Sequence, residues 1–202
     1  MHDQPTTLVN LAVERVVERA AQDRSRPGQH TLVMDGTANE RRSVLDRIEG
    51  RLRYRSPGTP PHIGRVQRPL ENATGGAAAL WDEVAGAAGL NETDHVHASG
   101  LGRIQNAAGE RPFVAIIDDL DAVLAGWNTP GEALNLRWAL QNVNGLMVIA
   151  ATKGPIGTDA SHEHAILAMT FAIQNLQAHG VTGVRTENTG GRGASRRRAG
   201  SA

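Results

Sequence analysis

The stretch FVAIIDD, residues 113–119, decides the fold, because five apolar residues lead directly into two carboxylates. An unbroken apolar run of this length is typical of a strand that is buried on both faces, as in a parallel sheet. Open α/β sheets bind ligands at the carboxyl ends of their strands, which is where Asp118 and Asp119 would lie. One carboxylate there can hold Mg²⁺ directly or through water, and the other can orient or deprotonate an attacking water.

Helical and strand-like patterns alternate on both sides of this stretch. Apolar spacing predicts helices over 6–21, 43–52, 74–88, 98–108, 130–142 and 161–178, and strands over 30–35, 63–67, 113–117 and 146–151. Residues 36–42 are expected to form a polar loop, and Thr129-Pro130-Gly131-Glu132 has the pattern of a capping box. The alternation predicts an α/β fold, a three-layer sandwich with a central parallel sheet of about five strands.

The composition narrows the class of protein. The chain has 202 residues, enough for one domain with a buried core, which we expect to span residues 1–184. Residues 185–202 are mostly Gly, Ser, Ala and Arg, so we expect a disordered basic tail. The 21 basic and 21 acidic residues balance, and the lack of cysteine excludes disulfides and thiolate chemistry. No apolar run approaches the roughly 20 residues of a membrane span, so a cytoplasmic protein is expected.

Over roughly residues 7–180, the order and spacing of these segments resemble the nucleotide-binding domain of P-loop NTPases of the AAA+/STAND type. The resemblance implies ATP and Mg²⁺ as ligands. Asp118 is similar to the Walker B carboxylate that holds Mg²⁺, and Asp119 occupies the position where this family commonly has a catalytic glutamate. Thr152, at the end of the fourth strand, resembles the sensor residue that contacts the γ-phosphate or the lytic water.

The segment after the first strand resembles a degenerate Walker A motif, GxxxxGK[ST]. Gly36 keeps the first glycine and Ser43 keeps the hydroxyl that binds Mg²⁺, whereas Asn39 lies where such loops often have an extra glycine. Arg41 replaces the second glycine and Arg42 replaces the lysine. Glycine lets backbone N–H groups wrap closely around phosphate, so Arg41 places a side chain where phosphate should lie. Arg42 keeps the charge of the lysine but neither its shape nor its reach.

Two functional classes follow from the resemblance. In the first, the chain is an ATP-binding domain and at most a weak ATPase. Arg42 would then hold phosphate, Ser43 and Asp118 would hold Mg²⁺, and Asp119 and Thr152 would position water. In the second, it is a pseudo-NTPase that serves as a protein-interaction or regulatory module without nucleotide. Both imply a protein partner or a homo-oligomer, and both leave open whether the chain is the remnant of a longer ATPase.

Both hypotheses require that residues 36–43 and the two acids border a common crevice, on neighbouring parallel strands.

Three other features of the sequence each allow two interpretations. His95/His97 and His162/His164 could bind zinc, although solvated histidines are the commoner outcome. The tail arginines 196–198 could contact nucleic acid phosphates or act as a solubilising end. The apolar helix expected over 161–178 could belong to the core or face a partner.

Overall fold

An all-parallel sheet forms the centre of the molecule. The structure, a computed structural model, describes residues 10, 14, 30–55, 60–67, 76–90, 99–127, 129–156 and 171–175. Four strands are hydrogen-bonded in the order β2-β3-β4-β1, and β5 pairs in parallel with the other side of β1. The strands are β1 (His30–Met34), β2 (His62–Val66), β3 (Phe113–Ile117), β4 (Leu146–Thr152) and β5 (Phe171–Asn175).

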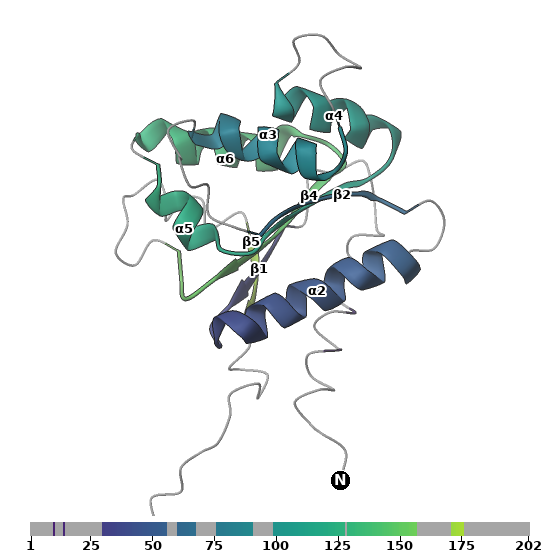
Figure 1. Cartoon of the computed structure of the whole chain (residues 1–202). Helices are drawn as coiled ribbons and strands as arrows, with labels where there is room; N and C mark the ends of the chain where they lie inside the picture. The colour runs from purple at the N-terminus through teal and green to yellow at the C-terminus, as the bar shows by residue number, and fades with distance from the viewer. Residues whose placement is uncertain are drawn as a thin grey trace, which may run out of the picture.

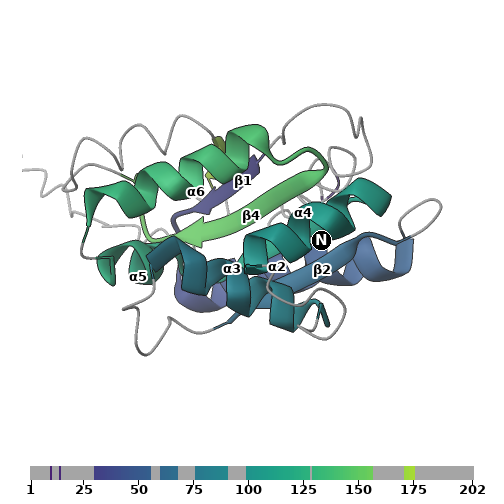
Figure 2. The same cartoon turned by 90° about the horizontal axis from the view of Figure 1, so that it is seen from above.

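Helices cover both faces of this sheet (Figure 1). Among the helices that the structure describes in full, α2 lies on one face, whereas α3, α4, α5 and α6 lie on the other. Seen from above, α6 lies over the β1/β4 side and α3 lies over β2 (Figure 2). The helices are α2 (Ala38–Arg55), α3 (Gly76–Ala87), α4 (Gly100–Glu110), α5 (Leu120–Ala125) and α6 (Pro130–Asn142). The predicted α/β class, with a parallel sheet between two helical layers, is therefore confirmed.

The apolar runs of the sequence become strands that are buried on both faces. All five residues of β3 and all seven of β4 are buried. Alternate residues of β3 point to opposite layers: Val114 and Ile116 pack in the core beneath α2, whereas Phe113, Ala115 and Ile117 pack beneath α3 to α6. Because a strand places successive side chains on opposite faces, both faces of the central strands must be apolar.

Two glycines allow close packing on the multi-helix face. A Cβ on Gly64 of β2 would collide with the backbone carbonyl of Val84 in α3. A Cβ on Gly100, the first residue of α4, would collide with the backbone at Trp81 and Asp82. The first glycine therefore seats α3 against the sheet, and the second lets the start of α4 approach the middle of α3.

Three expectations about the elements are wrong. Residues 38–42 are not a loop, because α2 already begins at Ala38. The segment 171–175 is strand β5 and not part of a helix over 161–178. The expected capping box at Thr129 does not form, since Thr129 makes no side-chain cap hydrogen bond and the Glu132 carboxylate accepts one from the backbone N–H of Ala77 instead, at 2.7 Å.

Several expectations fall largely or wholly outside the described residues. These are the helix expected over 6–21, the two H-x-H pairs and the tail. Of the first, only Asn10 and Glu14 are described, and both are helical. Within the described ranges, no cluster of three or more His, Cys, Asp or Glu side chains could hold a metal ion. No helix in those ranges combines the length and apolar character needed to cross a bilayer.

Candidate functional site at the carboxyl edge of the sheet

The expected phosphate loop and the acidic pair lie at the same edge of the sheet. β1 and β3 are both parallel neighbours of β4, which separates them. The prediction of adjacent strands was therefore wrong, although the predicted common edge is present. α2, which follows β1, covers one face, whereas α5, which follows β3, covers the other (Figure 1). Such divergence of connections marks the usual place for a ligand crevice in an open α/β sheet.

The carboxylate of Asp118 forms a bidentate ion pair with Arg65. Arg65 of β2 donates from Nε to Oδ1 at 2.7 Å and from its terminal nitrogen Nη2 to Oδ2 at 3.0 Å. Both side chains are buried, with exposed fractions of 7% for Arg65 and 5% for Asp118. β2 and β3 are in register, and Arg65 lies opposite Ile116. Paired, fork-like hydrogen bonds of this kind are the strongest geometry available to arginine and a carboxylate.

Two further carboxylates close around the same guanidinium. Arg65 Nη1 donates to Asp46 at 2.6 Å and to Glu49 at 2.8 Å, both on α2. Burial opposes the charge of Arg65, but its hydrogen bonds to Asp118, Glu49 and Asp46 outweigh that effect and raise its pKa. Burial likewise tends to raise the pKa of Glu49, while Arg65 and Arg53 lower it overall. The cluster therefore ties α2, β2 and the end of β3 together through the hydrogen bonds of one guanidinium.

Arg42 completes the cluster from the first turns of α2. Its Nε lies 3.6 Å from Asp118 Oδ2, and its side chain is 60% exposed. Arg53 also binds Glu49, at 2.8 Å. Three arginines (Arg42, Arg53 and Arg65) thus face three carboxylates (Asp46, Glu49 and Asp118). The cluster is formally neutral, so it has no excess negative charge that would attract Mg²⁺.

The segment that matches the phosphate loop is a tight turn followed directly by a helix. Asp35 and Gly36 have φ values of 62° and 70°, and α2 begins two residues later. Thr37 and Glu40 form a capping box: the Glu40 N–H donates to Thr37 Oγ1 at 3.2 Å, and the Thr37 N–H donates to the Glu40 carboxylate at 2.6 Å. A helix N-terminus attracts an anion, and here that anion is the carboxylate of Glu40.

Arg41 fills the space over the turn. Its guanidinium Nη1 donates to the carbonyl of Gly36 at 2.6 Å and approaches the carbonyl of Asp35 at 3.5 Å. The residue is only 6% exposed. A loop that binds phosphate presents backbone N–H groups to the ligand. Here the Arg41 guanidinium lies on the turn and donates to its carbonyl groups. The turn therefore presents hydrogen-bond acceptors at this place, where a phosphate loop presents donors.

The remaining predicted site residues lie at the same edge in structural roles. Asp119 caps α5 by accepting a hydrogen bond from the Ala122 N–H at 3.2 Å. Thr152 is buried, and its hydroxyl donates to the carbonyl of Gly154 at 2.8 Å. Asn39 and Ser43 are exposed on the first turns of α2. The structure therefore brings the predicted residues to one edge, but most of their polar groups already bond within the chain.

In this arrangement the residues do not fit Mg²⁺ and a nucleoside triphosphate. The carboxylate expected to hold the metal is paired with Arg65, and the helix N-terminus expected to hold phosphate is paired with Glu40. Opening the site would require breaking a buried, bidentate ion pair, and leaving one buried charge without its partner costs about 3–5 kcal/mol. The arrangement can hold three elements of the fold together, but it leaves no cradle for phosphate.

Sequence reasoning missed Arg65 and the capping role of Glu40. Glu40 had a readable signal, since Thr37-x-x-Glu40 before an amphipathic helix is the capping-box pattern. Arg65 had none locally, because it lies 53 residues before Asp118 and meets it only through the pairing of β2 with β3. No protein-family model matches the chain, and a search of curated proteins finds no match. The functional argument therefore rests on the geometry of this edge.

Proposed function

We propose that the chain is a P-loop NTPase-like domain of the AAA+/STAND type that does not bind nucleotide and acts as a protein-interaction or regulatory module. The proposal of P-loop ancestry is supported by the loop, the acidic pair and Thr152 lying at one edge of a parallel sheet. The proposal of a closed site is supported by one observation above all, the buried bidentate pair between Arg65 and Asp118. A carboxylate that binds Mg²⁺ offers an oxygen to the ion, whereas both oxygens of Asp118 accept hydrogen bonds from Arg65.

Unfolding with and without Mg·ATP tests this proposal. A ligand that binds only the folded state stabilises it by about 2.7 kcal/mol at 100 times its dissociation constant. We expect millimolar Mg·ATP to leave the midpoint of thermal unfolding unchanged relative to a buffer of matched ionic strength. A reproducible rise, reduced by both Arg42→Ala and Asp118→Asn, would instead establish the ATP-binding hypothesis.

A further inference from the structure

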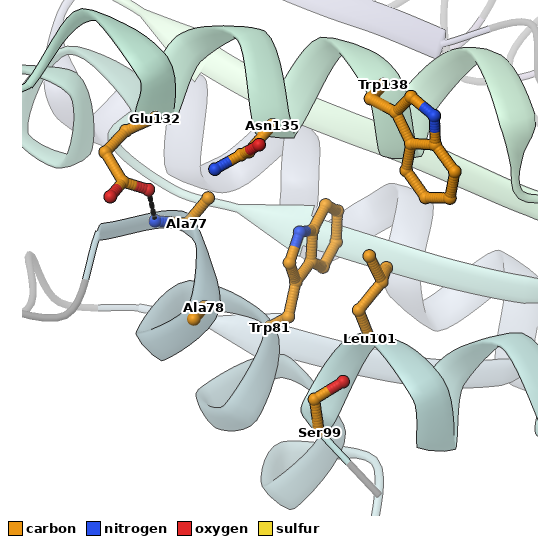
Figure 3. Close-up of a pocket in the computed structure, with 8 residues that line it drawn as sticks. All are labelled: Ala77, Ala78, Trp81, Ser99, Leu101, Glu132, Asn135 and Trp138. Atoms are coloured by element: carbon orange, nitrogen blue, oxygen red, sulfur yellow. Dashed lines mark hydrogen bonds between the residues drawn. The ribbon is translucent and has the colours of Figure 1, made fainter.

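A small pocket lies among the helices of the multi-helix face (Figure 3), on the other side of the sheet from α2 (Figure 1). Its volume is about 260 Å³, and α3, α4 and α6 each contribute to its walls. Trp81 and Leu101 face Asn135 and Trp138 across it (Figure 3). Pockets for drug-sized molecules usually measure about 300–1,000 Å³, so this one suits a single ring or side chain.

The pocket is built into the fold and is not a chance gap between mobile side chains. Glu132 at one end accepts a hydrogen bond from the Ala77 N–H, which anchors the start of α6 to the start of α3 (Figure 3). Gly76 permits this contact, because its φ is +56° and a Cβ there would collide with the Glu132 carboxylate. Gly100 brings α4 against the backbone of Trp81.

The chemistry of the pocket selects an aromatic group with a polar end and basic surroundings. Trp81 is 1% exposed, and its indole nitrogen has no hydrogen-bond partner within the described residues. Trp138 is 53% exposed and offers a ring wall for stacking. The lining includes one carboxylate, that of Glu132, and no basic side chain. A ligand that accepts a hydrogen bond and brings positive charge therefore complements this site.

The chain itself presents such a group on its opposite face. Tyr54, near the end of α2, is 86% exposed. Arg47 and Arg51 precede it by seven and three residues and so share its helix face, but Arg51 already pairs with Glu14 at 3.1 Å, and Arg53 pairs with Glu49 at 2.8 Å. The exposed Arg47 supplies the positive charge on the face of Tyr54. Among the described residues, the large apolar side chains classed as exposed are Tyr54, Leu134 and Trp138. The last two lie four residues apart on α6, and Trp138 lines the pocket.

We propose that Tyr54 of one copy inserts into the pocket between α3, α4 and α6 of a second copy, with Arg47 facing Glu132. The tyrosine hydroxyl can accept a hydrogen bond from an indole N–H and donate one to a carboxylate. The ring stacks against Trp138, and Leu134 borders the contact. This inference rests on the proposed interaction role, since it names the partner as another copy of the chain.

The contact is head-to-tail. α2 and α6 lie on opposite faces of the sheet, so a copy that inserts its tyrosine still has its own pocket open (Figure 1). Repeating such a contact gives a closed ring or an open chain of copies, unlike a two-fold dimer, which uses the same patch twice. Assembly should also weaken with salt, because rim charges of opposite sign contribute to it.

Sedimentation velocity over a range of concentrations tests the contact. We expect the full chain to form assemblies larger than a dimer, and Tyr54→Ala or Trp138→Ala alone to raise the dissociation constant at least tenfold. Glu132→Gln keeps the hydrogen bond to Ala77 but removes the charge, and should reduce the salt dependence. Gln105→Ala, an exposed position on α4 outside the pocket lining, serves as the matched control and should change nothing.

A mixture of the two defective variants gives the decisive result. Tyr54→Ala keeps an intact pocket and Trp138→Ala keeps an intact tyrosine, so a 1:1 mixture should form a heterodimer that grows no further. Both positions are exposed, so circular dichroism should show each variant folded. A monomeric wild-type chain at all concentrations, or assembly that persists in both variants, would overturn the inference without touching the proposal of a closed nucleotide site. Saturable Mg·ATP binding would overturn that proposal and leave this contact standing.

Discussion

Arg65 binds three carboxylates from one position on β2. Its guanidinium contacts Asp118 at the end of β3 and both Asp46 and Glu49 on α2. Exposed ion pairs contribute little, but this cluster lies beneath α2 with Arg65 and Asp118 almost fully buried. Removing the arginine would leave Asp118 without its bidentate partner in a poorly solvated place. The cost of that change measures how firmly the site is closed.

We predict that Arg65→Met lowers the free energy of unfolding by about 3 kcal/mol, because breaking a buried pair leaves one charge uncompensated. Denaturant unfolding at neutral pH measures this loss. Adding Asp118→Leu should recover part of it, since well-packed apolar residues often replace a buried pair at little cost. A loss below about 1 kcal/mol for the single variant would mean that the pair is too hydrated to close the site.

His30 is a second buried polar residue that sequence analysis did not single out. It is 2% exposed, and its Nδ1 accepts a hydrogen bond from the Val148 N–H at 3.0 Å. Nε2 lies 2.7 Å from the carbonyl of Leu140, which it can bond only as a donor. The ring also meets Phe171 of β5 edge-on, at 6.0 Å between centroids. Both hydrogen bonds require the neutral ring with its proton on Nε2.

Burial lowers the pKa of His30 despite its hydrogen bond to Leu140, so stability should depend on pH. The folded state binds this proton less readily than the unfolded chain. Its contribution is therefore complete above the unfolded pKa, near 6.5, and is lost as pH falls towards the folded pKa. Unfolding measured from pH 7 to pH 5 should show a smaller loss in His30→Gln, whose amide can donate and accept but does not titrate.

His62→Gln is the control for this experiment. Burial and the neighbouring Arg111 also lower the pKa of His62, so this variant should remove a separate part of the pH dependence. The His30 part should remain intact in it. If His30→Gln loses stability on acidification as steeply as the wild-type chain does, His30 is not the group responsible.

At the level of the elements, the buried strands and both ends of α6 were predictable, whereas the start of α2 and strand β5 were not. The runs 113–117 and 146–151 were predicted as buried strands because they are unbroken apolar stretches, and both are central strands of the sheet. The start of α2 was misplaced because the match to a Walker A motif favoured a loop over the capping box at Thr37. The segment Phe171–Asn175 was assigned to a helix because a short apolar run fits both periods. Only its pairing with β1 distinguishes the two.

The start of α3 depends on a tertiary cap that no local pattern reveals. Glu132 was expected to cap its own helix, α6. Its carboxylate instead caps α3, by accepting a hydrogen bond from Ala77, 55 residues earlier in the sequence. The cap requires a glycine at position 76, where φ is positive and the carboxylate lies against the missing Cβ. A side chain at this position must displace Glu132, which also forms one end of the pocket.

We predict opposite effects for two glycine-to-alanine changes in α3. Gly76→Ala should destabilise the chain by about 1 kcal/mol or more, because it combines an unfavourable φ with a collision against Glu132. Gly86→Ala meets nothing within 4 Å and should stabilise the helix by roughly 0.5–1 kcal/mol. Chemical denaturation of both variants under one set of conditions makes the comparison. Equal effects of either sign would refute the proposed cap.

In the molecule as a whole, the sheet brings the predicted residues together, while side chains from other elements determine the chemistry of the edge. The common edge of residues 36–43 and Asp118 was predictable, because parallel strands end on the same side. The ion pairs that close the edge were not predictable, because Arg65 comes from β2 and its partners Asp46 and Glu49 come from α2. A motif shows which residues meet at an edge, but not which other side chains reach it.

The closed edge and the pocket lie on different parts of the molecule. The ion-pair cluster fastens α2 to the sheet, and the same helix exposes Tyr54 near its C-terminal end. A firmly seated α2 holds the backbone of Tyr54 in place. In this account the carboxyl edge of the sheet serves as a structural clamp, and interaction takes place on the outer helical faces.

Calorimetric titration of Mg·ATP into the wild-type chain tests the central claim most directly. Arg65 is paired with Asp118, and the Glu40 carboxylate caps the start of α2. We therefore predict no saturable heat of binding up to millimolar nucleotide. Arg65→Met should gain no binding either, since the capping box and Arg41 would still cover the turn. A 1:1 isotherm for the wild-type chain with a dissociation constant in or below the millimolar range, lost in Asp118→Asn, would contradict the account.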